Sequence, residues 1–310
     1  MNNYIMHQFK ATEQFLSEIT PIKKFKLNTK GRDFVIGDVH GEYSYLMALL
    51  DHVNFDKNKD RLFSTGDLID RGYENEECLR LLAEPWFHAT LGNHEAMVLM
   101  FFYGQMDPGL WIANGARWAA HYISSYQNKK FDSKYRFSQD AAEFWYELVP
   151  LIMEKMSKMI TVRLRSWKKF HVVHAELNSH NFKLTDKNLL NAKFVNAAWT
   201  YNSDYGGIGD ECDGMWRRSI FNGANPDLVR ASISEDYLST IYSGHTIQSN
   251  TPFRVGPFVC LDTGSFMGNK QKYGISMTMP ETGETWMSNG FGVSAIEISD
   301  TESRKKQWLP

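Results

Sequence analysis

The sequence predicts a mixed α/β fold in which two β-sheets pack face to face and helices flank them. Between residues 34 and about 105, short apolar runs alternate with segments of helical periodicity. This alternation is typical of βαβ units with parallel strands and right-handed crossovers. Residues 240–299 consist mostly of strand-like runs instead. With no internal repeat and no low-complexity linker, we expect residues 1–310 to form a single domain.

The first 33 residues precede the first predicted strand as an N-terminal extension. Their apolar side chains, from Tyr4 to Ile19, follow helical spacing until Pro21, which stops a helix. We expect this helix to pack on the outside of the domain. The basic run at 23–26 is expected to be a solvated lead-in to the first strand.

The remaining elements follow from apolar periodicity and from turn residues. Helices are expected over 42–53, 75–83, from 95 onward, 111–120 and 144–156, with a break at Pro150. Later strands are expected over 160–162, 255–261, 274–277 and 293–298. Residues 176–215, rich in Asn, Gly and Asp, are expected to be a long inserted segment. Such a segment is either a plain surface loop or a rim over a functional site.

Five strand-like runs, at 34–36, 62–65, 87–91, 170–173 and 240–243, share one feature. Each delivers Asp, Asn or His at its carboxyl end. The residues delivered are Asp38, His40, Asp67, Asn93, His174 and His245. Open α/β sheets bind ligands in the crevice outside the carboxyl ends of their strands. The sequence therefore predicts that these side chains converge on one site.

Three imidazoles, two carboxylates and one amide are more ligands than one metal ion needs. A shared carboxylate, for which Asp67 is our candidate, could hold two ions about 3.5–4 Å apart. The mixture of N and O ligands without thiolate suits Mn, Fe, Zn, Co or Ni and does not choose among them. We take two divalent ions as the expected cofactors, with manganese as the first candidate. A water bridging them would become a hydroxide that attacks phosphorus in line.

Phosphate ester hydrolysis also needs an acid for the leaving oxygen and a group that grips the phosphate. His94 lies beside Asn93, and Asp70 could hold its ring by a hydrogen bond. Arginine grips phosphate in bidentate fashion, and Arg71 is the first candidate. Arg217 and Arg218 are further candidates. We expect Glu95 to serve the N-terminus of its helix rather than the chemistry.

Composition excludes several other classes. The formal net charge is −2, so neither nucleic acid nor a membrane surface is an expected partner. The three cysteines, Cys78, Cys212 and Cys260, lie far apart, which argues against a disulfide framework and favours a cytoplasmic protein. The N-terminus lacks the apolar stretch of a signal peptide, and no apolar run approaches the ~20 residues of a membrane span.

The motifs GDVHG at 37–41, GDLIDRG at 66–72 and GNHE at 92–95, followed by His174 and His245, resemble the calcineurin-like metallophosphoesterases. More narrowly, they resemble the phosphoprotein phosphatase group and, within it, the bacteriophage lambda-type protein phosphatases. The resemblance extends to the segment from Trp111 to Gly115 and to a Trp-x-Arg segment ending at Arg218. It covers residues 34 to about 275 in order.

The resemblance implies roles and a fold, a mixed β-sandwich flanked by helices. One metal would take Asp38, His40 and Asp67, and the other would take Asp67, Asn93, His174 and His245. His94 would be the acid, paired with Asp70, and Arg71 and Arg218 would hold the phosphate.

Three functions are compatible with these residues. The first is hydrolysis of phosphoprotein monoesters at Ser, Thr and perhaps Tyr. The second is hydrolysis of a small phosphoester such as a symmetrical dinucleoside polyphosphate. The third, from a different class, is a metal-binding interaction module without turnover. The sequence leaves the native metal, the physiological substrate and the oligomeric state open.

Overall fold

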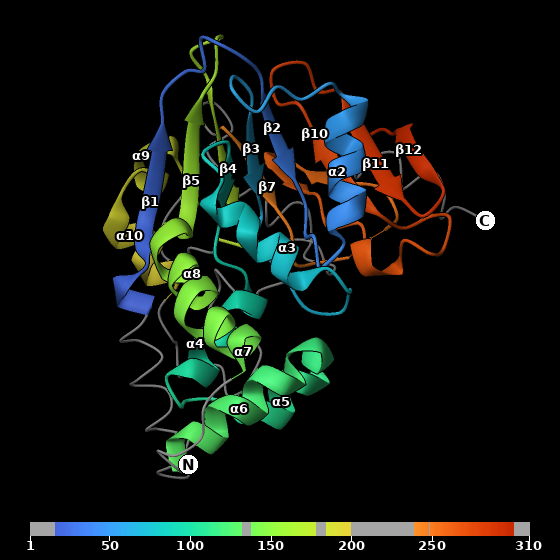
Figure 1. Cartoon of the computed structure of the whole chain (residues 1–310). Helices are drawn as coiled ribbons and strands as arrows, with labels where there is room; N and C mark the ends of the chain where they lie inside the picture. Colours follow the sequence, from blue (N-terminus) through green and yellow to red (C-terminus); the bar gives the residue numbers. More distant parts are fainter. Residues whose placement is uncertain (1–15, 132–137, 178–183, 200–238, 248, 301–310) are drawn as a thin grey trace, which may run out of the picture.

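The computed structural model describes residues 16–131, 138–177, 184–199, 239–247 and 249–300. Two β-sheets form its centre, and helices cover them (Figure 1). One sheet has six strands in the order β12-β11-β10-β2-β3-β4, and the other has seven in the order β1-β5-β6-β7-β9-β8-β13. The predicted fold class, mixed α/β with two sheets and flanking helices, is confirmed.

The six-stranded sheet contains the predicted βαβ units. Its strands are β2 (Asp33–Ile36), β3 (Arg61–Ser64), β4 (Phe87–Ala89), β10 (Ile275–Thr278), β11 (Thr285–Asn289) and β12 (Gly292–Ala295). β2, β3 and β4 pair in parallel, while β10, β11 and β12 add to β2 in antiparallel fashion. The connections from β2 to β3 and from β3 to β4 run through α2 (Tyr43–His52) and α3 (Asn75–Arg80).

The seven-stranded sheet brings together segments from the whole chain. Its strands are β1 (Thr20–Phe25), β5 (Ser157–Arg163), β6 (Lys169–Val173), β7 (Thr240–Ser243), β8 (Phe253–Val255), β9 (Phe258–Cys260) and β13 (Ser299–Asp300). β6, β7 and β9 lie parallel, which places the carboxyl ends of β6 and β7 side by side. The single strand expected over 255–261 is wrong, because Gly256, with a φ of 57°, turns the chain into an antiparallel β8–β9 hairpin.

Strand β1 was not expected from the sequence. Residues 20–25 pair in parallel with β5 at the edge of the sheet, so the prediction of a solvated lead-in at 23–26 is wrong for Lys23, Lys24 and Phe25. An edge strand can carry lysines because their apolar stems cover the sheet, and here their ammonium groups donate to backbone carbonyls, Lys23 to those of Glu154 and Lys155 and Lys24 to that of Leu190. The helix expected further upstream falls largely on residues 1–15, outside the described part of the chain.

Alternation along the strands builds a separate core on each face of the sheets. In β2, Val35 faces the seven-stranded sheet, whereas Phe34 and Ile36 belong to the larger core beneath the helices. The core between the sheets consists of Val35, Phe63, Ile160, Val162, Phe170, Val172, Tyr242, Val259 and Leu261. This packing holds the two sheets together and thereby sets the positions of their strand ends relative to each other.

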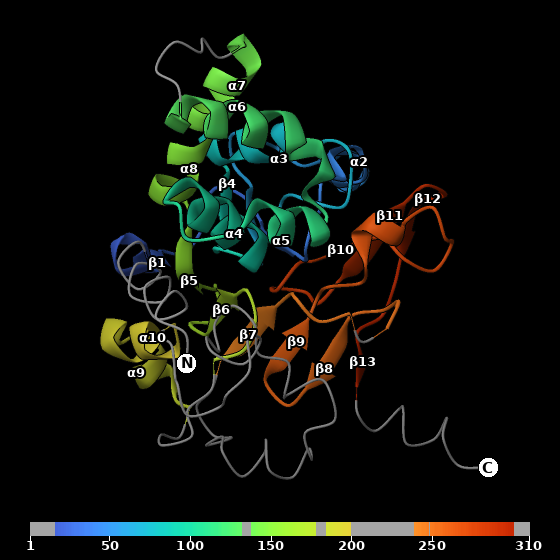
Figure 2. The ribbon, with the colours of Figure 1, turned by 90° about the horizontal axis from the view of Figure 1, so that it is seen from below.

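Helices lie on both outer sides of the sheets (Figure 2). On one side are α4 (Asn93–Phe102), α5 (Pro108–Ala113), α6 (Ala120–Phe131), α7 (Gln139–Glu143) and α8 (Val149–Lys155), and on the other are α9 (Asp186–Leu189) and α10 (Ala192–Ala198). Pro150 lies in the first turn of α8, but the expected break there is wrong, because the chain stays helical from a π-helical segment at Phe144–Leu148 into α8 and only the hydrogen-bond pattern changes. The single helix expected over 111–120 is wrong, because Gly115, with a φ of 115°, separates α5 from a short 3-10 helix at Ala116–Ala119.

Within the residues described, no helix is both long enough and apolar enough to cross a membrane.

The partly buried imidazole of His88 on β4 makes the stability of the fold depend on pH. Burial, followed by the charges of Arg61 and Lys23, lowers the pKa of His88 to about 4 from an ordinary value of 6.5. Its contribution to stability is therefore complete above pH 6.5 and is lost as the pH falls toward 4, because the unfolded chain binds the proton more tightly. We predict that His88→Gln reduces the loss of unfolding free energy between pH 7 and pH 5 by about 1–2 kcal/mol.

Urea unfolding at the two pH values measures this difference. His52→Gln, at an exposed position on α2, is the control and should leave the loss unchanged. Equal pH sensitivity in the His88 variant and the unmodified protein would contradict the prediction.

Candidate metal centre

The predicted convergence occurs at the carboxyl ends of β2, β3, β6 and β7 and at the N-terminus of α4. Parallel pairing of β2 with β3 and of β6 with β7 brings these ends to one edge of the molecule. The side chains that meet there are at most 5 % exposed; they are Asp38, His40, Asp67, Asp70, Asn93, His94, His174 and His245.

Asp67 lies at the centre of two clusters of potential metal ligands. One consists of His40, Asp67 and His94, and the other of Asp67, His174 and His245; within each, the ligand atoms lie within 4.8 Å of one another. Asp67 Oδ2 is 3.7 Å from His40 Nε2 and 3.8 Å from His94 Nε2. Asp67 Oδ1 is 3.5 Å from His174 Nε2. One carboxylate thus presents one oxygen to each cluster.

Backbone carbonyls determine which imidazole nitrogens face the clusters. His40 Nδ1 lies 2.9 Å from the Ile69 carbonyl oxygen, and His174 Nδ1 lies 2.9 Å from that of Thr65. A carbonyl oxygen can only accept, so each Nδ1 carries the proton and the lone pair of Nε2 points into the cluster. Metal-binding histidines are commonly oriented in this way.

The second cluster brings acceptor atoms unusually close together. Asn93 Oδ1 lies 2.8 Å from both His174 Nε2 and His245 Nδ1, and these two nitrogens are 3.2 Å apart. Nitrogen and oxygen atoms that converge with their lone pairs inward are the donor set of a divalent cation. The residues present therefore fit the metal requirement that the sequence predicted.

Asp38 takes part in neither three-residue cluster. Its Oδ1 accepts a hydrogen bond from Thr65 Oγ1 and its Oδ2 accepts one from the His245 N–H, both at 2.8 Å. Burial, then the charges of Asp262 and Asp67, raise the pKa of Asp38 well above its ordinary value. Buried carboxylates grouped in this way need positive charge beside them to remain ionised, which a bound cation supplies.

The pKa of Asp67 shifts in the opposite direction from that of Asp38. Burial favours its protonated form, but the positive charge of the surrounding imidazoles when they are protonated, His174 first, then His94 and His40, outweighs burial and holds the pKa of Asp67 well below its ordinary value. A carboxylate that stays ionised at every working pH is suited to a shared position between two cations.

The predicted acid, His94, is itself a member of the first cluster, and the predicted phosphate-gripping Arg71 lies beside it. His94 Nδ1 donates to Asp70 Oδ2 at 2.7 Å. Arg71 Nη1 and Nη2 donate to the Nε2 atoms of His40 and His94, at 3.0 and 3.1 Å. The ring of Phe266 lies over the Arg71 guanidinium at 4.7 Å. Arg218, like Arg217, lies outside the described residues.

The loops that carry the site have strained backbones. Positive φ angles occur at five of its non-glycine residues, His40, Asp67, Asp70, Arg71 and His245. Such conformations cost of order 1–3 kcal/mol each and persist only where the surrounding structure imposes them. This concentration at one place marks the strand ends as a functional site.

The Glu95 carboxylate accepts hydrogen bonds both at the start of its own helix, as expected, and from the loop that carries Asp67. Its Oε2 accepts from the N–H of Gly92 at 3.1 Å, which fits the expected role at the start of α4. The same carboxylate also accepts from the N–H groups of Asp67 and Leu68, at 3.0 and 2.7 Å. In return, the N–H of His94 donates to Asp67 Oδ1 at 3.0 Å. Glu95 therefore clamps the Asp67 loop onto the N-terminus of α4.

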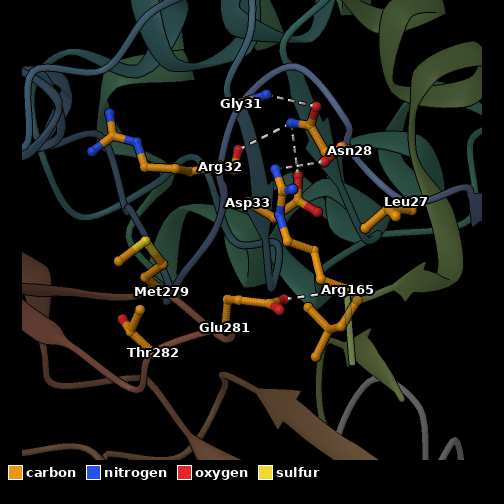
Figure 3. Close-up of a pocket in the computed structure, with 10 residues that line it drawn as sticks. Leu27, Asn28, Gly31, Arg32, Asp33, Arg165, Met279, Glu281 and Thr282 are labelled. Carbon is orange, nitrogen blue, oxygen red and sulfur yellow. Dashed lines mark hydrogen bonds between the residues drawn. The ribbon is translucent and has the colours of Figure 1, made fainter. Parts of the chain in front are cut away.

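A separate cavity of about 240 Å³ lies at the opposite, amino end of β2 (Figure 3). Its lining includes Asn28, Arg32, Asp33, Arg165, Met279 and Glu281, and none of the site residues. Arg32 pairs with Asp60 at 2.6 Å, and Asp33 pairs with Arg61 at 2.8 Å. Because these charges are paired within the protein, the cavity does not carry the chemistry that the sequence predicts.

Comparison with known proteins shows similarity to phosphoesterases. Residues 34–248 match the family model described as "Calcineurin-like phosphoesterase". The chain is 33 % identical, over 233 residues, to "Serine/threonine-protein phosphatase 2" of Salmonella typhimurium, which covers 75 % of this chain and 87 % of that protein. It is 44 % identical over 73 residues to "Bis(5'-nucleosyl)-tetraphosphatase, symmetrical" of Actinobacillus succinogenes, covering 23 % of this chain and 26 % of that protein.

A solved structure supports the fold alone. The cold-active protein-tyrosine phosphatase of a psychrophilic Shewanella species aligns over 91 % of this chain and 84 % of its own. The TM-score is 0.52 and the sequence identity is 16 %.

The contacts of Glu95 predict that loss of its carboxylate weakens both the fold and metal binding. Glu95→Ala leaves the buried N–H groups of Asp67 and Leu68 without their acceptor, at about 1–3 kcal/mol for each unpaired donor. We expect lower unfolding free energy and a smaller amount of divalent metal retained after gel filtration. Urea unfolding and elemental analysis measure the two quantities.

Glu281→Ala removes an exposed glutamate far from the site and should change neither quantity. Full metal retention in the Glu95 variant would show that the clamp is not needed to place Asp67.

Proposed function

This chain belongs to the calcineurin-like phosphoesterase family, and from that premise we propose that it hydrolyses phosphoprotein monoesters, at serine and threonine and also at tyrosine. The observation that carries the proposal is the placement of Asp67, with one oxygen toward each ligand cluster and the His94–Asp70 pair and Arg71 beside it. Two cation positions, an acid and a phosphate-binding arginine are the parts that phosphate ester hydrolysis requires.

We assign the metal ligands as the sequence predicted them. Asp38, His40 and Asp67 would hold one ion, and Asp67, Asn93, His174 and His245 would hold the other. When bound, the two ions supply Lewis acidity and lower the pKa of a coordinated water toward neutrality. Among the metals that suit this ligand set, we propose manganese.

The protein's own side chains then perform the remaining tasks. In this structure the two Nη groups of Arg71 donate to His40 Nε2 and His94 Nε2. With a cation bound to His40, these groups would turn to bind and orient the phosphate oxygens. Hydrolysis breaks a phosphorus–oxygen bond, and the leaving ester oxygen takes a proton from His94 Nε2. For this step the imidazole must be protonated and its Nε2 released from the Arg71 N–H that it accepts in this structure. Asp70 orients the His94 ring through Nδ1. We also propose Arg218 as a second phosphate-binding residue.

Coverage favours a phosphoprotein over a dinucleotide as substrate. The similarity to the Salmonella serine/threonine phosphatase covers most of both chains, whereas the similarity to the dinucleoside tetraphosphatase covers about a quarter of each. The shorter match is 44 % identical over its 73 residues, so hydrolysis of a symmetrical dinucleoside polyphosphate is the second candidate.

We propose a cytoplasmic location, since the two described cysteines, Cys78 and Cys260, are buried and form no disulfide.

A substrate panel tests the proposed function. Purified protein supplemented with Mn²⁺ would be assayed on phosphoserine, phosphothreonine and phosphotyrosine peptides, p-nitrophenyl phosphate and diadenosine tetraphosphate. We expect the phosphopeptides to be hydrolysed with a higher kcat/KM than diadenosine tetraphosphate. A preference for the dinucleotide by orders of magnitude would favour the second candidate, and no hydrolysis of any substrate would favour a non-enzymatic metal-binding module.

His94→Asn tests the proposed acid. We expect both metals to remain bound and kcat to fall by about 10²–10⁴, as is typical when a general acid is removed. The fall should be larger for phosphoserine peptide, whose serine oxygen is a poor leaving group without a proton, than for p-nitrophenyl phosphate. Equal losses on both substrates would rule out proton donation by His94.

A further inference from the structure

The carboxylate of Asp70 is completely buried and receives three N–H groups. Oδ2 accepts from His94 Nδ1 at 2.7 Å and from the indole Nε1 of Trp111 at 2.9 Å. Oδ1 accepts from the indole Nε1 of Trp118 at 2.7 Å. Each oxygen is therefore tied to a tryptophan, and one of them also contacts His94.

The two indoles are themselves held by packing. Trp111 on α5 is fully buried, and its ring centroid lies 5.8 Å from that of Phe101 on α4. Trp118 lies in the 3-10 helix that follows, with its ring 5.4 Å from that of Phe144 and 6.0 Å from that of Tyr122. Neither indole can move away from Asp70 without disturbing the helical layer.

The backbone between the two tryptophans docks on the same loop. Gly115, with a φ of 115°, turns the chain so that its carbonyl oxygen accepts from the Arg71 N–H at 3.1 Å. A Cβ at this position would lie 2.7 Å from Arg71 Cγ, so no larger residue fits without a shift. The turn thus carries Trp111 and Trp118, seven positions apart, to the two oxygens of one carboxylate.

We propose that Trp111 and Trp118 are positioning residues for the reaction, whose indole N–H groups hold the Asp70 carboxylate in the orientation that aims His94 at the leaving oxygen. This inference rests on the proposed function. The Asp70 backbone is already fixed, because its N–H donates to Asn75 Oδ1 at 2.7 Å. The orientation of the carboxylate is the remaining freedom, and a donor on each oxygen removes it.

Loss of one indole donor has two consequences. A buried carboxylate oxygen loses a charge-assisted hydrogen bond, and the carboxylate is free to rotate away from His94 Nδ1. The His94 ring then loses its fixed direction. Arg71 binds the substrate, and the proposed metal ligands do not include His94, so KM and metal content should change little when an indole donor is lost.

Conservative variants test this separation. Trp118→Phe and Trp111→Phe remove the donor and retain most of the aromatic packing. We expect kcat on phosphoserine peptide to fall about 10–100-fold, the usual effect of removing a partner of a site residue, with KM and bound metal near the unmodified values. The fall should be smaller on p-nitrophenyl phosphate, whose leaving group needs no proton.

Trp145→Phe is the matched control. Trp145 is a buried tryptophan of the same helical layer, and its indole donates at 2.8 Å to the Tyr122 carbonyl oxygen, away from the site. If Trp111→Phe and Trp118→Phe lose no more kcat than this control, or lose it equally on both substrates, the indoles act only in packing and the proposal is overturned.

A measurement without turnover separates this proposal from the proposed function. In protein labelled with ¹⁵N-tryptophan, the Trp111 and Trp118 indole resonances are assigned by their disappearance from the Phe variants. Asp70→Asn should shift these two resonances upfield and leave that of Trp145 in place. Unshifted resonances overturn the proposed contact even if the enzyme is active, and shifted ones support it even if no tested phosphoester is hydrolysed.

Discussion

The site depends on one buried carboxylate, that of Asp67, which lies among four imidazoles and presents an oxygen to each of two ligand clusters. The arrangement is electrostatically consistent only if the carboxylate stays ionised and the lone pairs around it meet positive charge. The carbonyls of Ile69 and Thr65 turn the histidine nitrogens inward, and Glu95 and the N-terminus of α4 hold the Asp67 loop. Most other features of the site serve this placement.

The sheets supply the rigidity that such a placement needs. Parallel pairing of β2 with β3 and of β6 with β7 brings strand ends from distant parts of the sequence to one edge, and the apolar core between the sheets keeps the two halves in register. Strained φ angles at His40, Asp67 and His245 are tolerated because short loops connect them to buried strands. The site is thus built from strained loops on an unstrained framework.

Much of this architecture was predictable because it depends on local pattern. The alternation of apolar runs with helical periodicity predicted β2, β3, β4 and their crossovers, and the residues following the strands predicted the convergence. The elements that were predicted wrongly also have a local cause. Polar edge strands such as β1 lack the apolar signature of a central strand, and the turns at Gly256 and Gly115 divided segments that periodicity alone joins.

By itself, the sequence determined which residue types stand at the strand ends, and hence the class of chemistry, because ligand identity and strand position are properties of the chain. Only the tertiary structure decided which atoms face one another. That Asp67 divides its oxygens between two clusters, that Glu95 reaches the Asp67 loop, and that Trp111 and Trp118 meet at Asp70 all depend on packing between elements distant in sequence. Such contacts have no local signature, because side-chain direction is set by neighbours that the chain brings together only on folding.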